Sequence, residues 1–322
     1  RGEQMDISMK EAAAFLREAD DIVILCHRNP DGDTLGCGYG LWHALRALGK
    51  RAAVRCSDPL PHKLRFLAEG YREEAFSPKT VVSVDIADEQ LFGEGLQEYL
   101  GRVDLAVDHH PSQTYFARRT LLEADSAAAC EVVCLLAQEL GVPFSAQMAA
   151  CFYTGMATDT GCFKFSNTTP RTHRLAARMM ELGCDYAEIG KRVFDTKTAG
   201  EFAIEREALN GMEVHFAGQA ALIVLTQEMY ARCGVSEADA DGLAALPRKL
   251  EGVEVGITIK ERGPGEYKIS MRSVDRVNVS ELCKLFGGGG HLRAAGCTIS
   301  GSLDEVKTLL LGAVGRALEE TA

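Results

Sequence analysis

The chain repeatedly places acidic and histidine side chains directly after short apolar runs, and this arrangement constrains the fold more than any other feature. The segment His27–Asp33 follows one such run, Asp85 follows a second, and the triplet Asp108-His109-His110 follows a third. Apolar runs of this length, bounded by turn residues, predict buried strands. In an open α/β sheet the carboxyl ends of the strands meet at one crevice, so we expect these side chains to converge there.

A fourth motif, Thr158-Asp159-Thr160-Gly161, completes the set. We expect Asp159 to reach the same edge from a strand end or from the loop after it. Taken singly, an aspartate in such a place is more often a turn or helix cap. Four motifs in one chain, each in this position, instead favour a cluster with a shared function.

Strands alternate with helices through the first half of the chain, which predicts a mainly parallel sheet flanked by helices, an α/β fold. Ser8 is a predicted N-cap, and Gly49 and Gly141 mark predicted helix ends. The predicted strands are 22–26, 52–56, 81–84 and 105–107, and the predicted helices are 8–19, 34–48, 127–140, 146–157, 171–182 and 186–194.

Weak periodicity over residues 195–205 predicts a linker, helical in part, between two domains of residues 5–194 and 206–322. The second domain is smaller and again α/β. Its predicted strands are 212–216, 220–225, 253–259 and 267–271, and its predicted helices are 236–247, 279–286 and 303–318.

Net charge, cysteine content and the length of apolar runs limit the partners and the location that we expect for this protein. The net charge is −11, which argues against long duplex DNA because proteins that grip a nucleic-acid backbone usually present a basic face. The eleven cysteines show no zinc-knuckle spacing, and reduced thiols of this kind predict a cytoplasmic protein. No run of about 18 apolar residues exists, so we expect no membrane span. Exposed helices leave room for a homodimer.

The residue types in the four motifs predict divalent metals. Oxygen and imidazole ligands without thiolate favour manganese or magnesium. Two-metal hydrolases hold their ions about 3.5–4 Å apart with a carboxylate between them. Pro30 and Gly32 bend the first motif so that its side chains can face a common point. The predicted ligands are His27, Asp31, Asp33, Asp85, His109 and Asp159.

These motifs, with Val84-Asp85-Ile86-Ala87-Asp88 as the second, resemble the four motifs of the DHH phosphoesterase superfamily. The segment Gly287–Gly296, preceded by Arg272-Ser273 and Val277-Asn278-Val279, is similar to the signature of the first type of DHH-associated C-terminal domain. The resemblance covers nearly the whole chain. The layout most resembles the bifunctional oligoribonucleases and phosphoadenosine-phosphate phosphatases within the superfamily.

The resemblance implies a role for each residue. His27 and Asp31 would hold the first manganese, and Asp33 the second. Asp85 would bridge them, and His109 and Asp159 would complete the second site. Asp108 would orient His109 or its neighbours, and His110 would face the phosphate as a donor or general acid. Of the other acidic residues near the motifs, Asp88 is predicted to be a helix cap and Glu131 to be structural or outside the ligand shell.

The glycine-rich segment predicts phosphate recognition in the second domain. Consecutive glycines allow backbone N–H groups to surround an anion, and an arginine can grip a phosphate with two hydrogen bonds. The predicted substrate-binding residues are Arg272, Ser273, Gly288, Gly289, Gly290 and His291, with Arg272 also assisting catalysis together with Asp108 and His110. Tyr267 and Phe286 are candidates for stacking on a base, although both suit the core better.

The implied activity is manganese-dependent hydrolysis, with magnesium as an alternative ion, through attack of a metal-activated hydroxide on phosphorus. The implied substrates are short RNA oligonucleotides, giving 5′-mononucleotides, and 3′-phosphoadenosine 5′-phosphate, giving AMP. Two alternatives stay open: a phosphodiesterase that prefers the linear dinucleotide pApA from cyclic di-AMP breakdown, and a nucleotide sensor that binds metal without turnover. A DNA exonuclease is disfavoured by the acidic charge.

Overall fold

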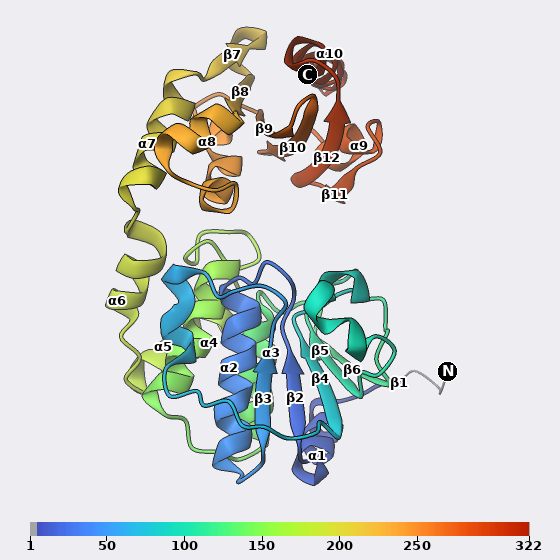
Figure 1. Cartoon of the computed structure of the whole chain (residues 1–322), viewed down its shortest axis with the longest axis vertical. Coiled ribbons are helices and arrows are strands. Elements are labelled where there is room, and N and C mark those ends of the chain that lie inside the picture. Colours follow the sequence, from blue (N-terminus) through green and yellow to red (C-terminus); the bar gives the residue numbers. More distant parts are fainter. Residues whose placement is uncertain (1–4, 322) are drawn as a thin grey trace. The chain divides into compact units, whose positions relative to one another are not determined.

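The computed structural model describes residues 5–321. The chain forms two compact units, the first ending at Thr196 and the second beginning at Lys197 (Figure 1). The segment predicted as a linker is helical from Ala199, where α7 (Ala199–Asn210) begins. Across the described part of the chain, no helix is both long enough and apolar enough to cross a bilayer.

The first unit is built on a six-stranded, all-parallel sheet with the strand order β1-β6-β5-β4-β2-β3. Its central strands are buried on both faces, as expected for a parallel sheet covered by helices. The four predicted strands are confirmed, whereas β1 and β6 were not predicted. The strands are β1 Met5–Asp6, β2 Ile22–Leu25, β3 Ala52–Arg55, β4 Thr80–Val84, β5 Leu105–Asp108 and β6 Arg119–Leu122.

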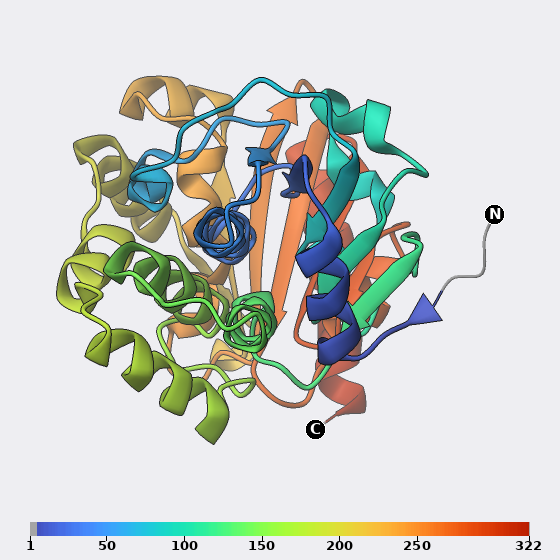
Figure 2. The same ribbon diagram turned by 90° about the horizontal axis from the view of Figure 1, so that it is seen from below.

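Helices pack against this sheet and against one another, with α2 in contact with both α3 and α4. Figure 2 shows α2 almost end-on. The predicted N-cap Ser8 is confirmed, since its side chain and that of Glu11 form a capping box. The helices are α1 Met9–Glu18, α2 Gly32–Ala47, α3 Ala129–Glu139, α4 Ala146–Asp159, α5 Pro170–Glu181 and α6 Tyr186–Gly190.

Short irregular helices complete the first unit. The predicted helix 186–194 is in fact α6 followed by a π-helical turn, η4 (Lys191–Asp195). Asp88 is confirmed as a cap, because its carboxylate accepts the N–H of Gln90 at the start of η2. The 3₁₀ helices are η1 His62–Ala68, η2 Glu89–Phe92 and η3 Glu94–Tyr99.

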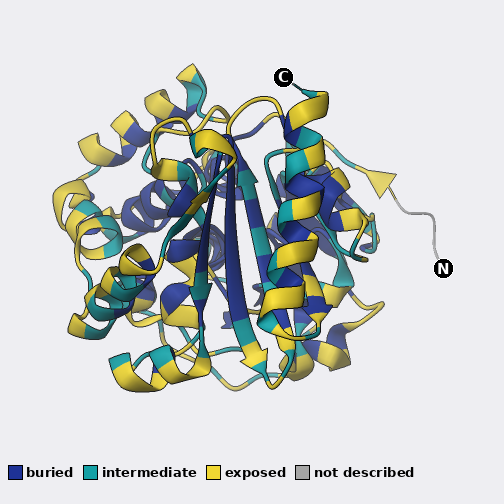
Figure 3. Cartoon of the chain, turned by 90° about the horizontal axis from the view of Figure 1, so that it is seen from above, coloured by how far each residue is buried: buried dark blue, intermediate teal, exposed yellow. Residues whose placement is uncertain are grey.

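The second unit contains a mixed six-stranded sheet in the order β11-β12-β10-β9-β8-β7, with only the β8–β9 pair parallel. Burial alternates along β10, so one face of this strand meets the core and the other is partly open (Figure 3). The strands are β7 Glu213–His215, β8 Ala220–Leu225, β9 Val255–Gly263, β10 Glu266–Ser273, β11 Gly289–His291 and β12 Ala294–Ser300.

Helices pack on both faces of the second sheet, but one face is covered only in part, which leaves a cavity over β10 and β12. The apolar side of α10 packs on the core face of β10, together with α9. The predicted helix 236–247 is instead two 3₁₀ segments, and α8 was not predicted. The helices are α8 Gln227–Cys233, α9 Val279–Lys284 and α10 Leu303–Glu320, with the 3₁₀ segments η5 Phe216–Gly218, η6 Ala238–Ala245 and η7 Pro247–Lys249.

Candidate metal centre and substrate pocket

Asp85 lies at the centre of the predicted ligand cluster. It follows β4 directly and adopts a left-handed backbone conformation with φ of 58°, while its N–H donates to the carbonyl of Val107. Its Oδ2 lies 3.5 Å from Nε2 of His27, and its Oδ1 lies 3.7 Å from Nε2 of His109. One buried carboxylate therefore stands between two imidazoles.

The first group of candidate ligands combines two residues of the loop after β2 with Asp85. His27, Asp31 and Asp85 each present one ligand atom, and these atoms lie within 4.8 Å of one another. Asp31 is also the N-cap of α2, where its Oδ1 accepts the N–H groups of Asp33 and Thr34. The cap explains why α2 begins at Gly32, two residues before the predicted start at Thr34, and it fixes the carboxylate beside His27.

The second group joins three elements. Nε2 of His109 lies 3.9 Å from Oδ2 of Asp33 and 3.4 Å from Oδ2 of Asp159. Asp33 is on the first turn of α2, and His109 follows β5. The expectation that Asp159 lies at a strand end is wrong. It is the last residue of α4, and the helix rather than a strand delivers it to the cluster.

Two buried atoms of this cluster have no hydrogen-bond partner in the described chain: Oδ1 of Asp85 and Nε2 of His109. Buried polar atoms are seldom left without a partner, because doing so costs about 1–3 kcal/mol. A divalent cation between these atoms would satisfy both, and carboxylates with imidazole are a normal ligand set for such an ion. The residues present therefore fit a divalent-metal site.

Hydrogen bonds to the other ring nitrogens fix the tautomers of both imidazoles. Nδ1 of His27 lies 2.8 Å from the carbonyl oxygen of Arg28, and Nδ1 of His109 lies 3.0 Å from that of Ser126. A carbonyl can only accept, so Nδ1 carries the proton in each ring. Nε2 of the neutral ring is left with its lone pair toward the carboxylates, as a metal ligand requires.

Asp108 is fully buried, and both of its carboxylate oxygens accept hydrogen bonds. Its Oδ1 accepts the N–H of His109 at 2.8 Å and Nδ1–H of His110 at 2.8 Å, while its Oδ2 accepts the amide of Gln113 at 2.6 Å. Asp108 therefore orients the ring of His110, while the ring of His109 is oriented by Ser126. Burial opposes a charge on His110, but Asp108 and nearby carboxylates outweigh it and raise the pKa of His110 to about 9.

The crowding of carboxylates changes their protonation. Burial and then the charge of Asp31 raise the pKa of Asp33 to about 6, and burial with the charge of Asp33 raises that of Asp159 to about 8. Burial and the same neighbour also raise the pKa of Asp85 well above its ordinary value. Against its burial, bonds to Asp31 and Asp85 raise the pKa of His27 to about 11. The metal-free cluster therefore retains protons that cations would displace.

Asp33 is held by the start of α3. Its two carboxylate oxygens accept the N–H groups of Ala129 at 2.7 Å and Cys130 at 2.8 Å. The residue before this helix, Ala128, has no side chain that could cap it. Asp33 therefore caps α3 from another helix, and the positive end of the α3 dipole favours the charged carboxylate.

One arginine that the sequence analysis did not single out connects α5 with the start of α3 and with the segment just before it. From α5, the guanidinium of Arg171 lies 3.0 Å from Oε2 of Glu131 and 2.5 Å from Oγ of Ser126. Glu131 is fully buried on the first turn of α3, which agrees with its predicted place outside the ligand shell. Since Ser126 orients His109, Arg171 supports a candidate ligand that it does not contact.

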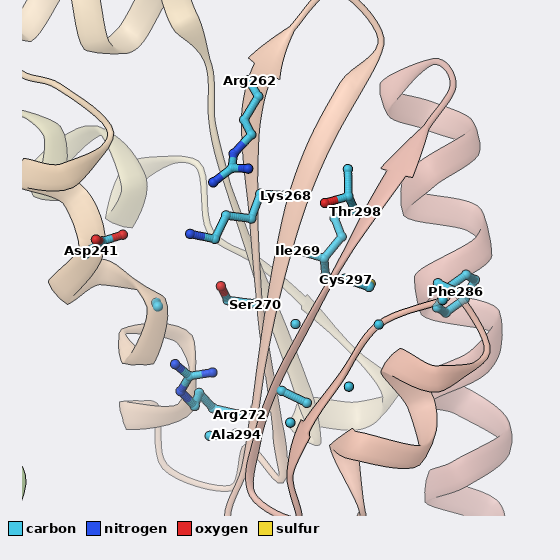
Figure 4. Close-up of a pocket in the computed structure, with 17 residues that line it drawn as sticks. Asp241, Arg262, Lys268, Ile269, Ser270, Arg272, Phe286, Ala294, Cys297 and Thr298 are labelled. Carbon is cyan, nitrogen blue, oxygen red and sulfur yellow. The ribbon is translucent and has the colours of Figure 1, made fainter. Parts of the chain in front are cut away.

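The second unit contains a separate cavity of about 710 Å³ on the open face of its sheet (Figure 4). Lys268, Ser270 and Arg272 project to the same side of β10, as alternate residues of a strand must. Burial and the charge of nearby Arg248 lower the pKa of Arg272. Among the described residues, the guanidinium of Arg272 makes only one hydrogen bond, to the adjacent carbonyl of Met271.

Two predicted substrate contacts are placed elsewhere. Ser273 is fully buried on the core face of β10 and does not line the cavity, because neighbouring residues of a strand point to opposite faces. Ser270 occupies the open face instead. His291 is exposed on β11 and is also outside the cavity lining.

The glycine run is folded more tightly than the predicted anion nest. Gly287, in the turn after α9, has φ of 72°, and the N–H of Gly288 donates to the carbonyl of Cys283. Gly289 and Gly290 then pair with β12. A side chain at Gly288 or Gly290 would collide with the β12 backbone. Gly288, Gly289 and Gly290 all line the cavity. The N–H of Gly288 already donates to a carbonyl of the chain, so it is not free to bind an anion.

The two candidates for base stacking differ in position. Tyr267 is buried in the core beneath the sheet. Phe286 lines the cavity, but its ring packs against the core and lies well apart from Arg272 in Figure 4.

Family models match both units. Residues 21–156 match the DHH family, N-terminal domain, and residues 224–320 match the DHHA1 domain. A curated protein of Thermus thermophilus is 33% identical over 96% of this chain and 94% of its own length. The chain therefore belongs to the DHH family of phosphoesterases.

The Thermus thermophilus relative is named bifunctional oligoribonuclease and PAP phosphatase NrnA. Among solved structures, an exopolyphosphatase-related protein from Bacteroides fragilis superimposes with a TM-score of 0.84 at 25% identity, covering 97% of this chain and 95% of its own. RecJ from Thermus thermophilus in complex with Mn²⁺ shares the fold, with a TM-score of 0.57 at 16% identity over 97% of this chain and 55% of its own.

Proposed function

We propose that this protein is a manganese-dependent hydrolase that degrades short RNA oligonucleotides to 5′-mononucleotides and converts 3′-phosphoadenosine 5′-phosphate to AMP. The name and 33% identity of the Thermus thermophilus relative support the substrate class. The observation that carries the proposal is the position of Asp85, whose two oxygens face His27 and His109 at 3.5 and 3.7 Å. A shared carboxylate of this kind suits two adjacent ions.

Each ion would have its own ligands. His27 and Asp31 would hold the first, Asp33, His109 and Asp159 would hold the second, and Asp85 would serve both. Two such ions would supply a nucleophile at neutral pH and neutralise charge on the phosphate oxygens. Manganese is the proposed ion, with magnesium as the alternative, since both accept oxygen and imidazole ligands.

His110 would act on the phosphate or the leaving group. Asp108 accepts Nδ1–H at 2.8 Å, and this buried carboxylate favours the protonated ring by raising the pKa of His110. The proton on Nε2 is therefore available to a phosphoryl oxygen or a departing hydroxyl. Gln113 holds Asp108 from the far side and so fixes the direction in which His110 donates.

The cavity of the second unit would hold another phosphate of the nucleotide. Arg272 is half-buried without a carboxylate partner in the described residues, and Arg248 adds a second positive charge. An arginine held in this way binds phosphate strongly because it is already partly desolvated. The backbone of Gly288–Gly290 would allow the ligand a close approach.

Phosphate release from 3′-phosphoadenosine 5′-phosphate tests the proposal. Protein stripped with a chelator should release no phosphate, and addition of manganese should restore release. A His110→Asn variant should bind manganese normally while losing about 10²–10⁴-fold in rate, the usual contribution of a general acid. Release that is unaffected by chelation and by His110→Asn would contradict the assignment.

A further inference from the structure

The segment after Asp159 folds back onto the backbone of this ligand. The carbonyl of Thr160 accepts the N–H groups of Lys164 at 2.9 Å and Phe165 at 3.0 Å. The side-chain amide of Asn167 donates to the carbonyl of Asp159 at 3.1 Å. Residues 160–167 therefore form a loop whose position is tied to the metal cluster. We call it the 160–167 loop.

The loop is held in a strained backbone conformation. Gly161, Cys162 and Phe163 have φ of 56°, 59° and 61°, so two non-glycine residues in succession are left-handed. L-residues avoid this region because Cβ approaches the carbonyl oxygen. The N–H of Phe163 donates to Oγ1 of Thr160, and its ring packs 5.6 Å from that of Tyr153. Such strain persists where surrounding contacts enforce it, and it is concentrated at functional sites.

The loop presents an exposed aromatic ring against Gly161, close along the chain to Asp159. Phe165 is 53% exposed, and its ring lies against Gly161, where any side chain would displace it. Gly161 is two residues after Asp159, so their Cα atoms are at most about 7.6 Å apart. Adjacent Lys164 is exposed, and its ammonium has no ion-pair partner within residues 5–321.

We propose that Phe165 stacks on a nucleobase of the substrate whose scissile phosphate is held at the metal cluster. The inference rests on the proposed function and adds a base-recognition site to it. An exposed ring offers a flat apolar face, and every nucleobase can stack on it regardless of sequence. Lys164 attracts the polyanion to the same place. The site would select nucleotides over phosphoesters without a base.

The test compares two substrates on four proteins. The substrates are a 5′-phosphorylated RNA dinucleotide and the same dinucleotide with both bases absent. The proteins are the wild type, Phe165→Ala, Phe165→Trp and the control Tyr186→Ala. Tyr186 is a comparably exposed aromatic residue on α6 whose ring lies 6.5 Å from that of Tyr153, so its removal controls for an indirect disturbance of the loop through Tyr153.

Phe165→Ala should raise KM for the dinucleotide by about 5- to 150-fold, the effect expected for one lost stacking contact. Its kcat should stay within about twofold, and kcat/KM for the abasic substrate should not change. Phe165→Trp and Tyr186→Ala should match the wild type. An unchanged KM, or an equal loss on the abasic substrate, would overturn the stacking role. Failure of the wild type on both substrates would instead refute the proposed function.

Discussion

The Nε2 atom of His109 lies 3.4 Å from Oδ2 of Asp159, although one residue follows β5 and the other ends α4. This meeting of a strand end and a helix end closes the second ligand group around Asp85. Because the candidate ligands come from the β2–α2 segment, the ends of β4 and β5 and the end of α4, the cluster forms only when the first unit is folded.

Replacement of the central carboxylate should abolish the metal site. Asp85→Asn keeps the shape but removes the charge shared by His27 and His109. We expect manganese affinity to fall by more than about 100-fold, since changes outside the ligand shell already cost 10- to 100-fold. Calorimetric titration of manganese measures this. The control is Asp88→Asn in the same segment, which retains a good cap for η2 and should bind like the wild type.

Loss of the arginine behind His109 should weaken the site from a distance. Arg171→Ala removes the bonds to Glu131 and Ser126, leaves a buried carboxylate unpaired, and should lower manganese affinity by about 10- to 100-fold. Arg174→Ala, an exposed change on the same helix, is the control. Identical affinities for the two variants would show that the network does not position the ligands.

The stability of the metal-free protein should fall as the pH rises from 6.5 to 8. The pKa of Asp159 is raised from 3.8 to about 8, and those of His27 and His110 are raised from 6.5 to about 11 and about 9. In this range the folded state holds protons that the unfolded chain has released. The free energy of unfolding therefore decreases by up to about 1.4 kcal/mol per pH unit for each fully shifted group.

Urea unfolding of chelated protein at pH 6.5 and pH 8 measures this dependence. Asp159→Asn removes one of the groups and should give a shallower decrease than the wild type. Stability that rises over this interval, or an equal slope in both proteins, would contradict the protonation assigned to the cluster.

The cavity of the second unit should depend on the charge of Arg272. Arg272→Gln should raise KM for a 5′-phosphorylated dinucleotide by about 10- to 100-fold, as expected for a lost charge-assisted hydrogen bond. Manganese affinity should be unchanged. Arg316→Gln removes the same charge from an exposed position on α10, which packs on the other face of the sheet, and serves as the control. Equal KM values for both variants would exclude Arg272 from substrate binding.

Two neighbouring glycines of the run, Gly288 and Gly289, allow a matched comparison of protein stability. At Gly288 a Cβ would lie 2.5 Å from Cβ of Cys297, whereas at Gly289 it would meet nothing within 4 Å. Gly288→Ala should therefore destabilise the second unit by about 1–3 kcal/mol, while Gly289→Ala should have little effect. Thermal unfolding of the two variants measures the difference. The opposite order would show that the run does not pack on β12 as described.

Sequence patterns predicted the parallel sheet because its buried strands are continuous apolar runs. They placed His27, Asp85 and His109 after those strands, where the structure has them. The position of Asp159 was predicted less well, because periodicity reveals a helix but not the direction in which it packs. The structure shows that α4 carries this residue to the cluster.

Contacts between segments that are distant in the sequence could not be predicted, because no local sequence pattern marks them. Arg171 and Glu131 are forty residues apart, and nothing in either segment marks the pair. Ser273 was predicted as a substrate contact from its neighbour Arg272, but strand alternation turns it to the core. Phe165 was not predicted at all, since its exposure follows from the left-handed turn before it.

The most direct test of the account is product analysis with a 5′-phosphorylated RNA trimer. Chelator-stripped protein is incubated with the trimer with and without manganese, and the products are separated by chromatography while metal content is measured in parallel. The account predicts 5′-mononucleotides only when manganese is present. Intact trimer at high protein concentration, with manganese demonstrably bound, would contradict the oligoribonuclease assignment.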